Sequence, residues 1–264
     1  MEQPDKELVV DVGNSRMKLG LFSHGRLLRH AVAPHGDMGA VHQFLAGTGV
    51  QRIAVGSVAR QDRQFEGALE RLAPVRMLEG GGPSPLGSTY ATPETLGVDR
   101  LANAVGAALV FPDRAVLVID LGSCATYDIV DELAVHQGGI IAPGLHMRAR
   151  AMHAFSARLP EVDPPENPVV PGHDTRTCLA AGTFHGMLHE IRGHIGFFRQ
   201  QYRNLAVVVT GGDAPRFVRA LKSGIFAHPS LTLIGLHALL HYDPQRGTAP
   251  LLGTKHRGPR TGHK

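Results

Sequence analysis

Two segments of the chain combine a carboxylate, a glycine and a hydroxyl or amide group directly after an apolar run. The first is Asp11-Val12-Gly13-Asn14-Ser15 and the second is Asp120-Leu121-Gly122-Ser123. The β-branched run before each segment predicts a buried strand, and the glycine permits a tight turn into a second strand. Each turn therefore places a carboxylate and backbone N–H groups at a strand end. Two such ends facing each other predict an internal duplication and a site for a nucleotide phosphate with its metal ion.

The first turn offers the groups that a phosphate site needs. Asp11 could hold a hydrated Mg²⁺, which commonly binds proteins through one or two carboxylates. Asn14, Ser15 and the nearby backbone N–H groups could hydrogen-bond phosphate oxygens, and Lys18 adds a positive charge. An ordinary hairpin turn is the alternative, since Asp, Gly and Asn are frequent in turns. The second, similar turn favours the phosphate site.

A third candidate segment, residues 90–100, ends a loop rich in Gly and Pro and begins a helix predicted from residue 98. Asp99 is a candidate general base toward a substrate hydroxyl, and Arg100 could bind an anionic group. The structural alternative is that Asp99 only stabilises the first helical turn through the helix dipole. In the second turn, Asp120 is a candidate cation ligand and Ser123 a candidate phosphate contact.

Weaker signals come from two glycine-rich segments and from histidine. Gly138–Gly144 and Gly211-Gly212-Asp213 indicate a close approach of the backbone, either to pack or to lie against a nucleotide. The chain has 16 histidines, which invites a metal hypothesis. However, His185, His189 and His194 lack a convincing ligand spacing with carboxylates, so we predict no zinc site.

The composition is that of a globular protein with a basic C-terminal end. The chain has 264 residues, of which 43% are hydrophobic and 19% charged, and no apolar stretch approaches the roughly 18 residues of a membrane span. The charged residues 1–7 lead into a strand rather than a secretory signal, and two cysteines fit a reducing cytoplasm, so we expect a cytoplasmic protein. Residues 253–264 hold four of the 27 basic residues and no acid. They predict a solvated, disordered tail, and a nucleic-acid role is the less favoured alternative.

The apolar patterns predict a similar order of elements in both halves of the chain. We expect strands at residues 8–13, 18–22, 26–34, 52–58, 75–78, 115–121, 126–130, 138–142 and 205–210, helices at 37–45, 62–72, 98–110, 145–157, 177–198 and 214–221, and a short strand running into a helix at 229–240. This order implies two similar α/β domains with a cleft between them. We place the domains at residues 1–113 and 114–252, followed by the tail at 253–264.

The motifs become specific when they are taken together. Four of them occur in the order Asp11-x-Gly13-Asn14-Ser15-x-x-Lys18, Tyr90…Leu96-Gly97-x-Asp99-Arg100, Asp120-x-Gly122-Ser123 and Gly138-Gly139-x-Ile141-x-Pro143-Gly144. This combination resembles the type III pantothenate kinases of the acetate kinase/sugar kinase/Hsp70/actin superfamily. The resemblance implies an α/β fold of two ribonuclease-H-like domains with an inter-domain cleft, and a homodimer. It also implies transfer of the γ-phosphoryl group of ATP, with Mg²⁺, to the 4′-hydroxyl of pantothenate, the entry step of coenzyme A biosynthesis.

The resemblance implies a role for each matching residue. The ATP phosphate loop would comprise Asp11, Val12, Gly13, Asn14, Ser15, Arg16, Met17 and Lys18, with Ser123 as a further ATP contact. The pantothenate pocket would comprise Tyr90, Gly97, Val98, Asp99, Arg100 and Thr175, with Thr177 as the alternative to Thr175. Asp99 would accept the proton of the substrate hydroxyl. Asp120 would bind a monovalent cation, K⁺ or NH₄⁺.

The chain departs from the family pattern at two places, and two other functions stay open. Ser123-Cys124 stands where the family usually has Thr-Ala, and Asp174 where Asn commonly precedes the Thr. One alternative is a non-enzymatic relative that serves as an accessory factor for transcription, against which the retained Asp99 and Arg100 argue. The other is a kinase of the same fold for a sugar, acetate or another small substrate, against which the segment 90–100 argues.

Overall fold

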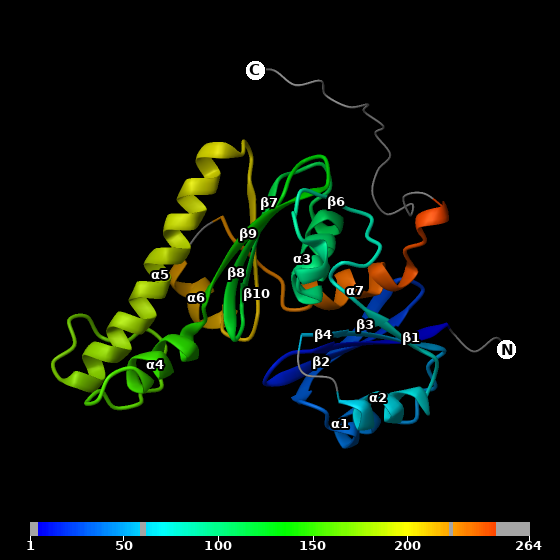
Figure 1. Ribbon diagram of the computed structural model, residues 1–264, viewed down its shortest axis with the longest axis horizontal. Coiled ribbons are helices and arrows are strands. Elements are labelled where there is room, and N and C mark those ends of the chain that lie inside the picture. The colour runs from blue at the N-terminus through cyan, green and yellow to red at the C-terminus, as the bar shows by residue number, and fades with distance from the viewer. Residues whose placement is uncertain (1–4, 59–61, 222–223, 247–264) are drawn as a thin grey trace.

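The first half of the chain forms a mixed sheet. The computed structural model describes residues 5–58, 62–221 and 224–246 (Figure 1). The first sheet has the order β3-β2-β1-β4-β5 and is built from β1 (Lys6–Val12), β2 (Arg16–Ser23), β3 (Arg26–Pro34), β4 (Arg52–Ser57) and β5 (Val75–Leu78). β1, β2 and β3 pair antiparallel, whereas β4 and β5 run parallel to β1. α1 (Met38–Leu45) and α2 (Arg63–Glu70) cover one face of this sheet (Figure 1).

The second half repeats this topology. The second sheet has the order β11-β10-β7-β8-β9-β6 and is built from β6 (Gly87–Ser88), β7 (Val116–Leu121), β8 (Cys124–Val130), β9 (Val135–Pro143), β10 (Ala206–Thr210) and β11 (Phe226–Ala227). β7, β8 and β9 pair antiparallel, while β10 and β11 run parallel to β7. Apart from β6, each strand has its counterpart in the first sheet. The predicted duplication of an α/β unit is therefore confirmed.

Two helices lie between the sheets and join them. α3 (Val98–Val110) has the predicted bounds, and it packs along α7 (Leu231–His241) (Figure 1). A Cβ at Gly235 would overlap the carbonyl group of Ala102, so the two backbones touch there. Such close packing agrees with the alanine-rich pattern of α3. The pair thus forms a firm central layer in the molecule.

α7 belongs to the second half of the sequence but packs on the first sheet. Leu233 and Leu236 are fully buried, in the same cluster as Val9 of β1 and Ala54 of β4. The boundary between residues 1–113 and 114–252 stays a prediction. It assigns α7 to the second domain and so does not account for the packing of α7 on the first sheet. The predicted tail, residues 253–264, lies outside the described residues.

The remaining helices cover the other face of the second sheet. They are α4 (Leu145–Ala154), α5 (Thr175–Gln201) and α6 (Ala214–Leu221). α5 begins at residue 175 rather than 177 because Asp174 caps it: the Asp174 side chain accepts the backbone N–H of Thr177. The strand expected near 229 is β11, which comes earlier, at residues 226–227. Over the described part of the chain, no helix is both long and apolar enough to cross a membrane.

Candidate active site

The two predicted turns occupy equivalent places in the two sheets. Asp11 lies near the end of β1 and pairs with Lys18 of β2. Asp120 lies near the end of β7 and pairs with Thr126 of β8 in the same way. The duplication of the fold thus presents one carboxylate from each sheet.

Three carboxylates influence one another at this place. The pKa of Asp11 is raised to about 6, first by burial and then by the charges of Asp120 and Asp99, while Lys18 lowers it. Burial also raises the pKa of Asp99, again with Asp120 contributing. Because charges affect one another strongly only at short range, the structure brings Asp11, Asp99 and Asp120 together from β1, α3 and β7. Such a cluster attracts cations.

A chain of polar contacts runs between the two turns through α7 and α3. The ammonium group of Lys18 lies 3.7 Å from Oδ2 of Asp11 and donates to Oγ1 of Thr232 at 3.5 Å. Thr232 donates to Oδ1 of Asn103 at 2.9 Å, and Nδ2 of Asn103 donates to Oδ2 of Asp120 at 2.7 Å. Asn103 and Thr232 were not predicted, because a polar residue within a largely apolar helix does not indicate which distant residue it contacts.

The first turn divides its residues between core and surface. The N–H of Gly13 donates to the carbonyl oxygen of Arg16 at 3.0 Å, and a Cβ at residue 13 would lie within 3.0 Å of that oxygen. The side chains of Val12 and Met17 are buried, so only their backbone could contact a ligand. The turn exposes the side chains of Asn14, Ser15 and Arg16.

The second turn lies against two close backbone segments. Gly144 donates its N–H to the carbonyl oxygen of Ser123 at 3.2 Å. A Cβ at Gly211, whose φ is 96°, would overlap Oδ1 of Asp120. The Ser123 side chain is exposed and Cys124 is partly buried. Both glycine-rich signals of the sequence therefore mark segments packed against this turn.

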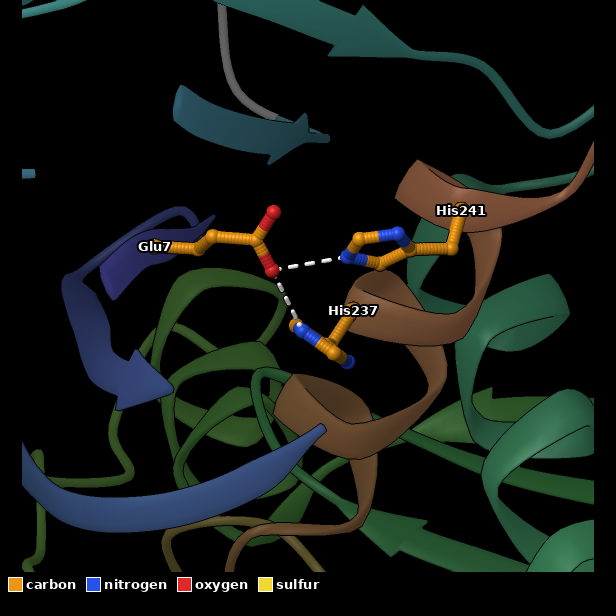
Figure 2. Close-up of side chains that lie close together, drawn as sticks. All are labelled: Glu7, His237 and His241. Carbon is orange, nitrogen blue, oxygen red and sulfur yellow. Dashed lines mark hydrogen bonds and ion pairs between the residues drawn. The ribbon is translucent and has the colours of Figure 1, made fainter. Parts of the chain in front are cut away.

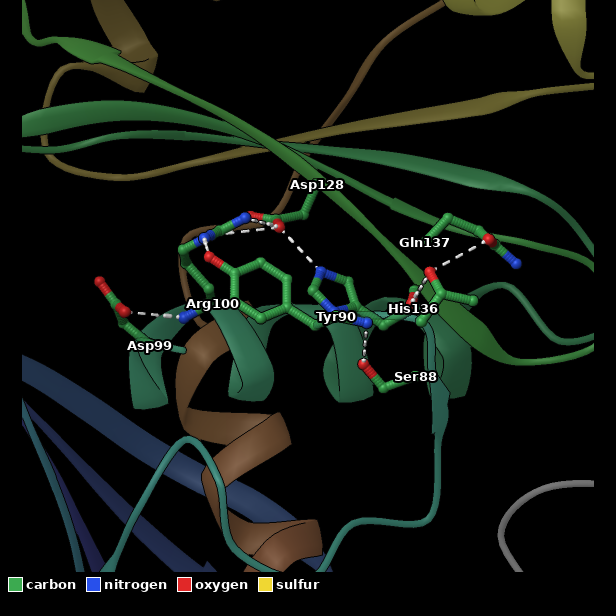
Figure 3. A network of polar contacts seen from close by, with 8 residues as sticks. Ser88, Tyr90, Asp99, Arg100, Asp128, His136 and Gln137 are labelled. Atoms are coloured by element: carbon green, nitrogen blue, oxygen red, sulfur yellow. Dashed lines mark hydrogen bonds and ion pairs between the residues drawn. The ribbon is translucent and has the colours of Figure 1, made fainter. Parts of the chain in front are cut away.

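Arg100 is held in a buried network (Figure 3). Its Nη2 donates to Oδ1 of Asp128 at 2.6 Å and its Nε donates to Oδ2 at 3.0 Å, while its Nη1 donates to Tyr90 Oη at 3.3 Å. Nε2 of His136 lies 2.8 Å from Oδ1 of Asp128, and the His136 ring stacks on Tyr90 with 6.0 Å between the ring centroids. Asp128 neutralises the guanidinium, so an anionic substrate would have to share this cation.

Asp128 and His136 were missed by the sequence reasoning. The available signal was a charged residue within the apolar run of β8, where the side chains are otherwise buried. Asp128 is 1% exposed and His136 is fully buried. A carboxylate in such a place needs a charged partner, and Arg100 supplies it.

Asp99 lies beside Arg100 at the start of α3 and joins that network through the Arg100 backbone (Figure 3). Its Oδ1 accepts the backbone N–H of Arg100 at 2.8 Å, as expected for an acid in the first turn of a helix. Asp99 thus stabilises the helix start, and burial raises its pKa, while its role as a proton acceptor stays a prediction.

A cavity of about 620 Å³ opens beside the start of α3. Gly97 and Val98 line it, together with Glu79, Glu94 and the end of β4. A Cβ at Gly80 would overlap the carbonyl group of Leu96, so the loop before α3 is tightly folded. The cavity is large enough for a small ligand or part of one.

Thr175 is the one candidate that the structure places elsewhere. It is the exposed first residue of α5, which lies on the opposite side of the second sheet from α3 (Figure 1). The hydroxyl of Thr177, the alternative, accepts the N–H groups of His173 and Asp174, both at 3.0 Å. Within one chain, neither threonine joins Asp99.

The chain matches known proteins along most of its length. The family model described as type III pantothenate kinase matches residues 7–196. A type III pantothenate kinase of Bacteroides fragilis is 37% identical over 240 residues, covering 90% of this chain and 99% of the relative. One of Cytophaga hutchinsonii is 36% identical over 236 residues, covering 89% and 99%.

Solved structures share the fold at lower identity. A Campylobacter jejuni protein assigned to the Baf family of transcriptional activators has a TM-score of 0.57 at 21% identity, covering 90% of this chain and 99% of that one. A Sinorhizobium meliloti protein assigned as a 2-dehydro-3-deoxygalactonokinase has a TM-score of 0.51 at 13% identity, covering 88% and 97%. The paired sheets confirm the predicted fold class, two ribonuclease-H-like halves. With the family model and relatives above 30% identity, the chain belongs to the type III pantothenate kinase family.

Proposed function

We propose that this protein transfers the γ-phosphoryl group of ATP to the 4′-hydroxyl of pantothenate, the first step of coenzyme A biosynthesis. The observation that carries the proposal is the chain of polar contacts that joins Asp11 to Asp120 between the two sheets, with Asp99 one turn before Asn103 on α3. Phosphoryl transfer depends on positioning and on cations that neutralise the transferring group, and a carboxylate cluster can hold such cations.

Asp99 serves as the proton acceptor. The 4′-oxygen of pantothenate attacks the γ-phosphorus, the bond from that phosphorus to the bridging oxygen breaks, and ADP leaves. The hydroxyl proton passes to the Asp99 carboxylate. Burial and the nearby Asp120 raise the pKa of Asp99, which makes it a better base than a free carboxylate.

The residues of the first turn fit ATP with Mg²⁺. Asp11 offers a hard carboxylate oxygen, Lys18 a positive charge, and Gly13 a partly exposed backbone without a Cβ. When bound, Mg²⁺ neutralises charge on the transferring phosphoryl group. The exposed groups of Asn14, Ser15 and Ser123 would hydrogen-bond the phosphates, and the backbone of the turn would do the same.

Asp120 is our proposed ligand for a monovalent cation. Its Oδ2 accepts from Asn103, and its Oδ1 lies against the backbone at Gly211. One carboxylate among backbone groups suits K⁺ or NH₄⁺ better than a second Mg²⁺. Replacing K⁺ by Na⁺ in the assay should lower the rate, and equal rates in both salts would remove this assignment.

Exposed apolar side chains support a homodimer. Phe155, directly after α4, is 92% exposed, and Val169 and Val170 are 69% and 61% exposed. A second copy of the chain would cover these side chains. Light scattering should give twice the chain mass, and Phe155→Glu should lower it, whereas Leu28→Glu, at an exposed site on β3, should not. Thr175, distant from Asp99 in one chain, would bind substrate only from the second copy.

The two cysteines are free in the described structure. Free thiols suit a reducing compartment, so we place the protein in the cytoplasm.

A coupled assay of ADP release tests the proposed activity. The protein is given ATP, Mg²⁺ and K⁺ with pantothenate, glucose or acetate in turn. Activity that requires pantothenate, with phosphorylated pantothenate detected by mass spectrometry, supports the proposal. Activity with glucose or acetate instead would support a kinase activity but reject pantothenate as the substrate. Absence of turnover with all three compounds would reject the proposed kinase activity.

A further inference from the structure

A cluster outside the proposed active site holds one carboxylate and two imidazoles (Figure 2). Nε2 of His237 lies 2.8 Å from Oε2 of Glu7, and Nε2 of His241 lies 2.7 Å from the same oxygen. Glu7 is near the start of β1, whereas Asp11 is near its end, so the two sites lie toward opposite ends of one strand. The kinase reaction as proposed uses none of the three residues.

We propose that Glu7, His237 and His241 form a binding site for a divalent transition-metal ion of the Zn²⁺ type. The two histidines are four positions apart on α7, which places them on one helix face, the spacing at which two imidazoles can bind one zinc ion. A carboxylate from another element completes a His₂Glu set, which is a known zinc ligand set. The three ligand atoms all lie within 4.8 Å of one another.

The geometry needs only small movements to accept the ion. Zinc bonds of about 2.0–2.1 Å in a tetrahedral arrangement separate the ligand atoms by about 3.3 Å. The observed distances from Oε2 of Glu7, 2.7 and 2.8 Å, are those of hydrogen bonds whose protons the ion would replace. Both imidazoles already direct Nε2 at the carboxylate (Figure 2), so no change of rotamer is required.

Neighbouring groups hold the ligands in place. The His237 ring stacks on Phe22 with 4.1 Å between the centroids and 8° between the planes, which restrains the imidazole. Nη2 of Arg52 lies 2.9 Å from Oε1 of Glu7, so this arginine orients the carboxylate while Oε2 faces the histidines. The Arg52 side chain is 47% exposed, so water screens its repulsion of a bound cation.

The surroundings also favour a site with an open coordination position. Glu7 and His237 are buried, whereas His241 is 36% exposed at the end of α7. Water can therefore reach the ion as a fourth ligand. An ion here would fasten the start of β1 to the end of α7, and we assign it a structural role.

Titration of the full-length, tag-free protein with Co²⁺ and Zn²⁺ tests this site. We expect one ion per chain at micromolar affinity or tighter, with the visible absorption bands of four-coordinate Co²⁺. His241→Gln and Glu7→Gln should each weaken binding by about 100-fold or more, since even an outer partner of a ligand contributes 10–100-fold. The control is His42→Gln, which removes an exposed histidine from α1 and should change nothing.

A melting curve gives the second readout. Zn²⁺ should raise the Tm of the wild type and of His42→Gln, but not that of His241→Gln. Circular dichroism checks that each variant is folded. Absence of saturable binding to the wild type, or equal binding by all variants, would overturn the proposal. Either result leaves the kinase assignment untouched, because the assay for pantothenate is separate.

Discussion

The amide of Asn103 on α3 donates to the carboxylate of Asp120 on β7 at 2.7 Å, and its oxygen accepts from Thr232 on α7 at 2.9 Å. Asn103 is 1% exposed. This one side chain thus ties the second sheet to the two central helices, at the carboxylate that we propose as a cation ligand. A buried polar group in such a position fixes the orientation of its hydrogen-bond partners as well as contributing to stability.

Replacing Asn103 by Ala should uncouple Asp120 from the helices. The free energy of unfolding should fall by about 1–3 kcal/mol, because buried partners lose their hydrogen bonds. The K⁺ concentration for half-maximal activity should rise as well. Urea unfolding and a K⁺ titration measure the two effects. Thr232→Val is the comparison: it removes the bonds of Thr232 to Asn103 and Lys18 but keeps the Asn103–Asp120 bond, so an equal shift in K⁺ dependence would refute the coupling through Asp120.

Asp99→Asn should lower kcat by about 10²–10⁴-fold, the usual contribution of a general base, while Tm stays near that of the wild type. The amide keeps the shape of the side chain and its hydrogen bond to the Arg100 N–H, but it cannot take the substrate proton. Asp62→Asn is the control, since Asp62 caps α2 and asparagine caps equally well. A variant within threefold of wild-type activity would reject Asp99 as the base.

Asp128→Asn should be strongly destabilising, by about 3–5 kcal/mol, because the buried Arg100 guanidinium would lose its charged partner. The two side chains are only 5% and 1% exposed. The control is Arg219→Gln, which breaks an ion pair with Glu166 whose side chains are 76% and 51% exposed. That change should alter stability by less than about 1 kcal/mol in urea unfolding. Similar losses in the two variants would contradict the buried pair.

The Asp11 carboxyl predicts a pH dependence of stability in the ligand-free protein. Its pKa is raised by burial from 3.8 to about 6, so folding takes up a proton at this group between those values. Its contribution to stability therefore grows as the pH falls from about 7 to about 4, and levels off below. Asp11→Asn should be more stable than the wild type near neutral pH, and the difference should shrink toward pH 4. A difference that stays constant with pH would exclude the raised pKa.

The local parts of the site could be predicted from the sequence. Asp11 and Asp120 lie in turns that are predicted by their glycines and by the β-branched runs before them. The bounds of α3 follow from its apolar periodicity and from the loop before it. These features depend on neighbours a few positions away. For the same reason the repeated order of strands could be read from the chain.

The long-range parts could not be predicted. Asn103 meets Thr232 over 129 positions, Arg100 meets Asp128 over 28, and Glu7 meets His237 over 230. No local sequence pattern predicts such pairs, because a polar residue among apolar ones indicates that it needs a partner but not which residue that partner is. For this reason we placed α7 in the second domain and did not predict its packing on β1. The apolar pattern of a helix does not indicate which sheet the helix covers.

Because α7 packs on the first sheet, the two cores of this protein can be completed only at different times during synthesis of the chain. The core that packs β7 and β10 against α5 and α6 comes from residues 117–217, which leave the ribosome as one continuous stretch. The core around Val9 and Ala54 needs Leu233 and Leu236, which are made much later. The half that is synthesised first is thus completed last. A chain that stops before residue 231 would leave part of this apolar face, including Val9 and Ala54, without the cover of α7.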